Sequence, residues 1–195
     1  MPRIRYIEDH EQTDETRRLI ASAERTGAPD PRVVSIMTRH PTAGIGWVRY
    51  WNSLLYEGLL PHTLKELCRI FISMEHECGY CSTVRSNVAR EQGLTEEKVM
   101  PLASFETSPL FDDRERAALR YARLFKQGEH AIDSDDVYEA LKKSFSEEEI
   151  IELGQMCAQT DGVGKLVKSL NVMSWGEACE LNPDLARTKN AIAAE

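Results

Sequence analysis

The sequence predicts an all-α fold for this chain of 195 residues. Apolar residues recur at intervals of three and four along almost its whole length, which is the period of helices packed on a core. No run alternates apolar and polar residues for long enough to indicate a strand. The hydrophobic content of 42% is sufficient for one compact core.

A first helix is predicted from Thr13 to just before Gly27, where the segment GAPDPR interrupts the helical period. This break separates an N-terminal helical arm, residues 1–30, from a core domain, residues 31–172. The next helix has a wide apolar stripe that consists of Trp47, Val48, Trp51, Leu54, Leu55 and Leu59. Such a stripe is typical of core packing, although its two tryptophans could also line a pocket.

A third helix begins in the segment PHTLKEL and continues to Met74. Thr63 and Glu66 have the spacing of a capping box, which is by itself a sufficient role for this glutamate. The segment STVRSNVAREQG follows soon afterwards and is predicted to be helical as far as Gly93.

The C-terminal half also contains residues that are typical of helix starts and ends. Thr95 is predicted to cap a short helix, and FDDRERAALRYARLFKQG is an amphipathic helix that ends at Gly128. After a short helix in DSDDVYEALKKSF, Ser146 and Glu149 form a capping box at the start of a long helix. Residues 173–195 have no clear period and are predicted to form a C-terminal tail.

The charge balance excludes some partners. The chain has 24 Lys and Arg against 32 Asp and Glu, a net charge of -8 that repels nucleic acids and anionic membranes. No window approaches about 18 uninterrupted apolar residues, and the charged N-terminus lacks the apolar segment of a secretory signal. We therefore expect a soluble, cytoplasmic protein.

Cys78 and Cys81, in EHECGYC, form the one C-x-x-C pair among five cysteines. Structural zinc needs four ligands, and here the other cysteines are single and His76 adds at most a third ligand, so we expect no metal. Haem attachment is excluded because Ser82 follows the pair instead of a histidine. Two buried cysteines acting as small hydrophobic side chains are an alternative.

Redox chemistry is the other interpretation of the pair. If Cys78 begins a helix and Cys81 lies one turn along it, the two sulfurs share a face and can form a disulfide. The helix dipole would then favour a thiolate, and Arg85, four residues after Cys81, would project from the same face as a permanent cation. Alternatively Arg85 is a surface charge or pairs with Glu77 or Glu91.

Three segments carry a family resemblance. In KELCRIFISMEHECGYC a glutamate, Glu66, precedes Cys78 by twelve residues, and FDDRERAALRYARLF and FSEEEIIELGQMCA follow further along. Together with the preceding helix these segments, over about residues 40–172, resemble the carboxymuconolactone decarboxylase superfamily and within it the alkylhydroperoxidase AhpD-like branch. The resemblance implies an all-helical homo-oligomer, without a cofactor, that reduces hydroperoxides with a dithiol.

The resemblance also implies roles for individual residues. Cys81 would attack the hydroperoxide, Cys78 would resolve the sulfenic acid as a disulfide, and Glu66 would be one arm of a proton relay. The family's relay histidine is replaced here by Arg85, and Tyr80 stands where some members have another histidine. We therefore expect a thiol-dependent peroxidase or disulfide-exchange protein, reduced by a lipoyl-domain or thioredoxin-like protein.

Other functions are compatible with the same resemblance. The founding members are cofactor-free decarboxylases or lactone-processing enzymes that do not depend on a C-x-x-C pair. A non-catalytic assembly protein with a vestigial dithiol is a further alternative. His62 and His76 flank the motif and could substitute for the missing relay histidine.

Overall fold

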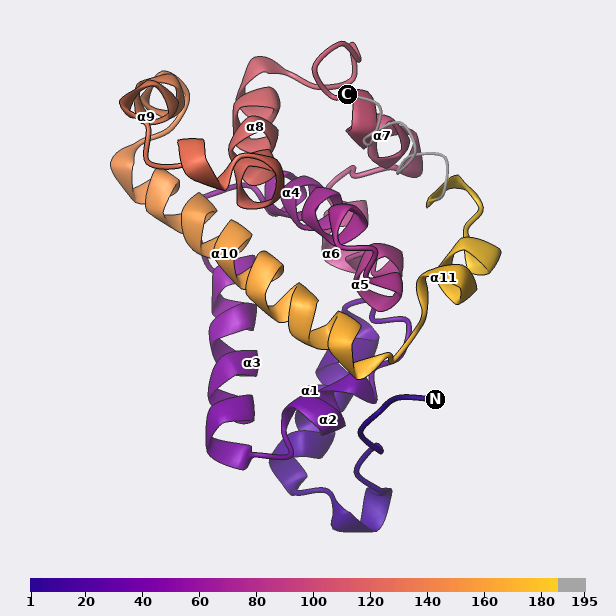
Figure 1. Cartoon of the computed structure of the whole chain (residues 1–195). Coiled ribbons are helices and arrows are strands. Elements are labelled where there is room, and N and C mark those ends of the chain that lie inside the picture. Colours follow the sequence, from indigo (N-terminus) through magenta and orange to yellow (C-terminus); the bar gives the residue numbers. More distant parts are fainter. Residues whose placement is uncertain (186–195) are drawn as a thin grey trace.

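The computed structural model describes residues 1–185, and all regular secondary structure in this range is helical (Figure 1). The predicted all-α class is confirmed for the described part of the chain. The elements in order are η1 (Asp9–Glu11), α1 (Asp14–Arg25), α2 (Val33–Met37), α3 (Pro41–Tyr56), α4 (His62–Glu75), α5 (Gly79–Thr83), α6 (Asn87–Glu91), α7 (Glu96–Val99), η2 (Met100–Ser104), α8 (Asp113–Gln127), η3 (Glu129–Ala131), α9 (Asp135–Lys142), α10 (Glu147–Leu170) and α11 (Trp175–Leu181). Within residues 1–185 no helix is both long and apolar enough to cross a membrane.

Helix α4 is the centre of the fold and packs against α8 on one side and α10 on another. Twelve of its fourteen residues, from His62 to Met74 with one exception, are buried. Its apolar side chains, such as Ile70 and Phe71, belong to the main core, where Phe71 meets Phe105 edge to face. A helix surrounded in this way must satisfy its polar residues internally, because water does not reach them.

One of these internal pairings joins α4 to α10. The Lys65 ammonium, 1% exposed, donates to Glu152 at 2.8 Å and to the Leu54 carbonyl at 2.7 Å. Glu152 also accepts the backbone N–H groups of Leu59 and Leu60. This buried pair therefore connects both helices to the turn between α3 and α4.

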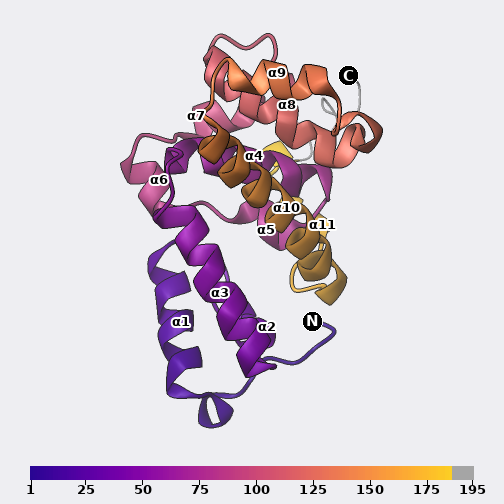
Figure 2. The ribbon, with the colours of Figure 1, turned by 90° about the vertical axis from the view of Figure 1, so that its left-hand side faces the viewer.

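Helices α1, α2 and α3 form the end of the molecule opposite α7, α8 and α9 (Figures 1 and 2). Helix α1 packs against α2 and α3, and α3 packs against α10. The Tyr6 hydroxyl donates to Asp30 at 2.7 Å, which holds the first residues of the chain beside the turn before α2. The predicted N-terminal arm thus lies along the core helices.

Several predicted helix boundaries are confirmed. Thr13 and Thr95 cap α1 and α7, and Gly128 ends α8. Ser146 and Glu149 form the expected reciprocal capping box at the start of α10. These signals are local and do not depend on tertiary packing, which is why the sequence is sufficient to place them.

Three expectations are wrong. Thr63 and Glu66 form no capping box, because the N-cap of α4 is Pro61, two residues before Thr63, and the Glu66 carboxylate turns inward. The helix expected through STVRSNVAREQG is two short helices, α5 and α6, separated at residues 84–86. The tail expected from residue 173 contains α11, which Ser174 and Glu177 cap reciprocally, and its last ten residues lie outside the described part.

Candidate functional site

The cysteine pair lies at the start of α5, as the spacing predicts. Cys78 is the N-cap residue and Cys81 lies one turn into the helix, with their Cα atoms 5.2 Å apart and their sulfurs joined as a disulfide. The Cys81 backbone N–H points at the Cys78 sulfur, 3.2 Å away. This N–H would stabilise a thiolate at Cys78 in the reduced pair, because a cap donor favours negative charge.

The two cysteines differ in access. Cys78 is 1% exposed, whereas Cys81 is partly exposed and lines a cavity. A molecule that enters the cavity therefore meets Cys81 first. Cys68 and Cys157 are free and buried, and Cys179 is free and partly exposed in α11.

The predicted site residue Glu66 is 2% exposed and makes a two-pronged ion pair with Arg69, which lies three residues further along α4. The two contacts are 2.6 and 3.0 Å long. Burial alone would raise the pKa of Glu66, but the Arg69 guanidinium outweighs burial and holds that pKa below its ordinary value. Glu66 is therefore an anion at neutral pH, and its charge is matched by Arg69.

Arg69 also reaches the dithiol helix. Its guanidinium donates to the carbonyl oxygens of Cys81 and Val84, each at 2.8 Å, so that one side chain binds Glu66 and the C-terminal end of α5. No sequence motif indicated Arg69. The pattern that could have indicated it is the i, i+3 spacing of an acid and an arginine on an otherwise apolar helix.

Arg85 does not project from the same helix face as Cys81, because α5 ends at Thr83. Its guanidinium donates to Glu96 at 2.8 Å and to the carbonyl oxygens of Ser82 and Val84. The salt bridge is with Glu96, and not with Glu77 or Glu91 as expected from the sequence. The structure thus brings Cys78, Cys81 and Glu66 together through Arg69, and it pairs the buried Arg85 with Glu96 beside the α5–α6 connection.

Tyr80 lines the same cavity as Cys81. Its hydroxyl donates to the Asp30 carbonyl at 3.2 Å, which ties α5 to the segment before α2. Burial raises the pKa of Tyr80, so the phenol keeps its proton at neutral pH.

The two histidines considered as substitutes have other partners. His62 contacts the Leu55 carbonyl at 2.9 Å and the Ser86 hydroxyl at 2.7 Å. His76 contacts Asp161 on α10 at 2.7 Å, and its other ring nitrogen is buried. Burial lowers the pKa of both rings.

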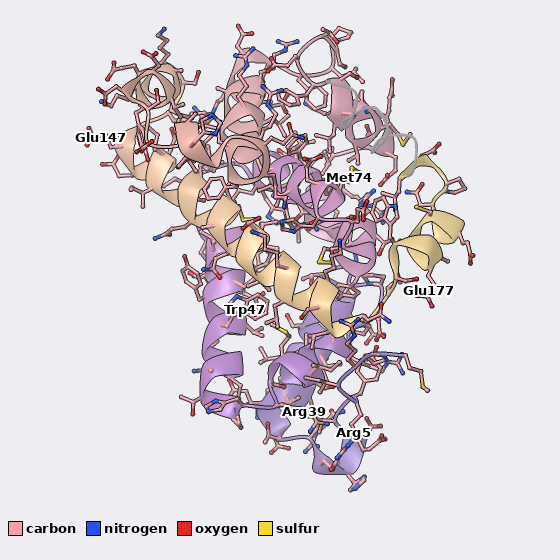
Figure 3. The ribbon with its side chains drawn as sticks, viewed as in Figure 1. Arg5, Arg39, Trp47, Met74, Glu147 and Glu177 are labelled. Carbon is pink, nitrogen blue, oxygen red and sulfur yellow. A yellow bond between two sulfur atoms is a disulfide. The ribbon has the colours of Figure 1, made fainter. Side chains whose placement is uncertain are left out.

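The cavity beside Cys81 has a volume of about 180 Å³. Helices α1, α2, α3 and α10 supply its apolar walls, and α4 and α5 supply Glu66, Arg69, Tyr80 and Cys81. The apolar lining residues include Leu19, Ala23, Val33, Val34, Met37, Trp47, Val48, Trp51, Leu55, Val163 and Val167. Both tryptophans of the α3 stripe therefore face a cavity, and Figure 3 places Trp47 where α3 passes α10.

No group of three or more His, Cys, Asp and Glu side chains in residues 1–185 is arranged to hold a metal ion. The described site can support the chemistry of a dithiol. A thiolate at Cys81 would face the cavity, with Cys78 behind it and a matched ion pair at its side.

Residues 41–124 match the model of the carboxymuconolactone decarboxylase family. The matched residues include α3, α4 and the cysteine pair, so this part of the chain is similar to that family, as the resemblance in the sequence suggests. A protein of unknown function from Agrobacterium tumefaciens, for which AhpD-type antioxidant defence has been suggested, has a similar fold. That protein has 21% identity and a TM-score of 0.59, with 69% of this chain and 91% of the other covered.

This chain also resembles the debrominase Bmp8 in fold. The TM-score is 0.74 at 19% identity, over 96% of both chains. A cysteine-to-alanine variant of Bmp8 in complex with 2,3,4-tribromopyrrole gives a TM-score of 0.71 at 18% identity, with 98% of this chain and 100% of the other covered. At these identities the likeness establishes the fold alone.

Two bacterial relatives are similar in sequence. The alignment with an uncharacterised protein of Mycobacterium tuberculosis is 29% identical over 129 residues and covers 56% of this chain and 44% of that protein. The uncharacterised protein YdfG of Bacillus subtilis is 24% identical over 91 residues, which are 47% of this chain and 62% of YdfG. The chain thus spans less than half of the mycobacterial protein and somewhat under two thirds of YdfG.

Proposed function

We propose that this protein is a cytoplasmic, dithiol-dependent oxidoreductase that reduces hydroperoxides with Cys78 and Cys81. The observation that carries the proposal is that Cys81 lines an apolar cavity while its partner is buried behind it. Access favours Cys81 as the attacking residue. The buried Cys78, with a backbone N–H directed at its sulfur, suits the resolving role.

The proposed reaction has two steps. The Cys81 thiolate attacks the outer oxygen of the hydroperoxide, so that an S–O bond forms, the O–O bond breaks and the alkoxide takes a proton from water to become an alcohol. The Cys78 thiolate then attacks the sulfur of the Cys81 sulfenic acid, and hydroxide leaves and is protonated to water. The pair is oxidised by two electrons, which a thiol donor of the lipoyl or thioredoxin-like kind returns.

In this proposal Arg69 is the cation that acts on the dithiol. Its contact with the Cys81 carbonyl places a permanent positive charge at the attacking residue, which favours the thiolate. Glu66 positions that guanidinium and limits its field, because the two charges are paired. Arg85 holds the α5–α6 connection, and Tyr80 holds α5 to the N-terminal segment.

The test is the loss of hydroperoxide in the presence of dithiothreitol, followed with the parent and with Cys78→Ser and Cys81→Ser variants. Both variants should lose catalytic turnover. Cys179→Ser is the matched control, since it removes a partly exposed thiol outside the site. Equal turnover in the parent and the two site variants would refute the proposal.

A second candidate function is reductive dehalogenation. The observation that favours it is the extent of the likeness to the debrominase, because the matched 96% takes in most of the N-terminal helices that wall the cavity. The electron balance is equivalent: Cys81 sulfur takes the halogen from carbon, the carbanion is protonated, and Cys78 displaces halide as the disulfide forms. A decarboxylase or lactone-processing enzyme would keep its activity in the Cys78→Ser and Cys81→Ser variants. In a non-catalytic assembly protein, the dithiol would react with neither the hydroperoxide nor the halogenated compound.

A further inference from the structure

The cavity beside Cys81 has the size of one substituted ring. Its volume of about 180 Å³ is slightly larger than that of an engineered apolar cavity of roughly 150 Å³ that binds benzene. Hydrogen peroxide would leave most of this space empty. A single ring with one short substituent would fill it.

One wall of the cavity is aromatic. Trp47 and Trp51, one turn apart on α3, both line it, with ring centroids 5.9 Å apart and ring planes inclined by 25°. The Trp47 indole N–H donates to Gln159 on α10 at 3.2 Å, which satisfies its polar edge and fixes the ring. Fixed indole faces favour an aromatic ligand, because offset stacking adds to the gain from burial.

The polar groups lie towards the opposite end. Tyr56, five residues beyond Trp51 on α3, lines the cavity and stacks on His62, one turn before Glu66 on α4, with ring centroids 4.9 Å apart. The tryptophan pair is further along α3 from this end, by about 1.5 Å of rise per residue. Because Glu66 and Arg69 neutralise each other, the cavity presents no unmatched charge to a ligand.

We propose that the cavity binds a neutral, single-ring aromatic molecule against Trp47 and Trp51, with its reducible substituent directed at Cys81. The ring is the recognised part, and the substituent is either a hydroperoxide or a ring halogen. The inference about turnover rests on the proposed function, whereas the inference about binding does not.

Binding is tested in a Cys78→Ser/Cys81→Ser variant, which cannot turn over. The variant also carries Trp175→Phe, so that the two cavity tryptophans are the remaining indoles of the three in the chain. Titration with 2-phenyl-2-propanol should change the tryptophan fluorescence saturably, and tert-butanol should bind at least tenfold more weakly. Equal binding of the two alcohols, or no saturable change with either, overturns the inference.

Turnover is tested with cumene hydroperoxide against tert-butyl hydroperoxide. The kcat/KM ratio should favour the aromatic substrate in the parent and fall severalfold in Trp51→Ala. Tyr50→Ala removes an exposed aromatic side chain from the same helix and should leave the ratio unchanged. An unchanged ratio in Trp51→Ala would contradict the proposal.

Two compounds distinguish the two substituents. Bromide release is measured with 2,3,4-tribromopyrrole, and peroxide loss is measured with cumene hydroperoxide. Reaction with cumene hydroperoxide assigns the hydroperoxide, and bromide release assigns the ring halogen. Saturable binding of 2-phenyl-2-propanol without dithiol oxidation by either compound would support the ring site and refute the proposed function.

Discussion

Arg69 binds Glu66 with two nitrogens and the Cys81 carbonyl with a third, so one buried guanidinium links the acid that the family resemblance identifies to the cysteine that we propose as the attacking residue. A permanent cation at this point changes how the site can work. The thiolate does not depend on a titrating imidazole, because arginine stays charged at every relevant pH. The glutamate's partner is an arginine on its own helix.

Arg69→Met should slow disulfide formation with hydroperoxide at neutral pH. The expected loss is about tenfold, the effect of one unit in the thiol pKa when the thiol is mostly protonated. The rate against pH should shift to higher pH in this variant. Arg85→Met is the control, since its guanidinium contacts Glu96 and two carbonyl groups; it should lower stability and leave the pH profile in place. If the rate profile against pH shifted in Arg85→Met and not in Arg69→Met, Arg85 would be the cation that favours the thiolate.

Glu66→Gln separates two roles for the glutamate. If Glu66 positions and neutralises Arg69, the amide leaves more positive potential at Cys81 and the rate profile moves to lower pH. If Glu66 relays protons, the same variant loses rate at all pH values. We expect the shift to lower pH, measured as the stopped-flow rate of disulfide formation between pH 5 and pH 9.

The sequence was sufficient for the helical class and for most helix starts, because capping residues such as Thr13 and Ser146 act locally. It was not sufficient at Val84, where the chain leaves the helical conformation and Arg69, fifteen residues earlier, binds its carbonyl group. The capping-box spacing of Thr63 and Glu66 was misleading for a similar reason, since the carboxylate pairs with the buried Arg69 and not with a helix terminus.

The cavity also could not be predicted from the sequence. Its walls come from helices far apart in the chain, and the tryptophan stripe of α3 has the same spacing whether it faces core or cavity. The pattern therefore suggested a pocket as an alternative, and tertiary packing decided it. The cysteine pair was the feature that sequence located best, because the three-residue spacing determines its geometry on any helix start.

Lys65→Met should destabilise the protein strongly. The substitution leaves Glu152 buried without its cation, and breaking a buried pair in this way costs about 3–5 kcal/mol. The double variant Lys65→Met/Glu152→Gln should recover part of the loss. Urea unfolding measures both, and Lys142→Met, at an exposed pair, should change little. Equal stability of parent and Lys65→Met would show that the pair is not needed for folding.

Acidification should destabilise the fold before any carboxylate is protonated. Burial lowers the pKa of His62 and His76, so the unfolded chain binds more protons than the folded chain between the lowered values and about 6.5. The free energy of unfolding therefore keeps its highest value above about pH 6.5 and decreases as the pH drops through this window. Urea unfolding at pH 7.5 and 5.5 measures the effect, and His76→Gln should reduce it while the exposed His10→Gln should not. Constant stability over this range would contradict the burial of neutral histidines.

The attack by Cys81 is tested most directly by intact mass in a Cys179→Ser background. With Cys78→Ser added, one equivalent of cumene hydroperoxide should increase the mass by about 16 Da, the sulfenic oxygen, and peptide mapping should place it on Cys81. With Cys81→Ser added instead, the mass should stay unchanged over the same time. Oxidation of Cys78 in the second variant, as fast as that of Cys81 in the first, would contradict the account.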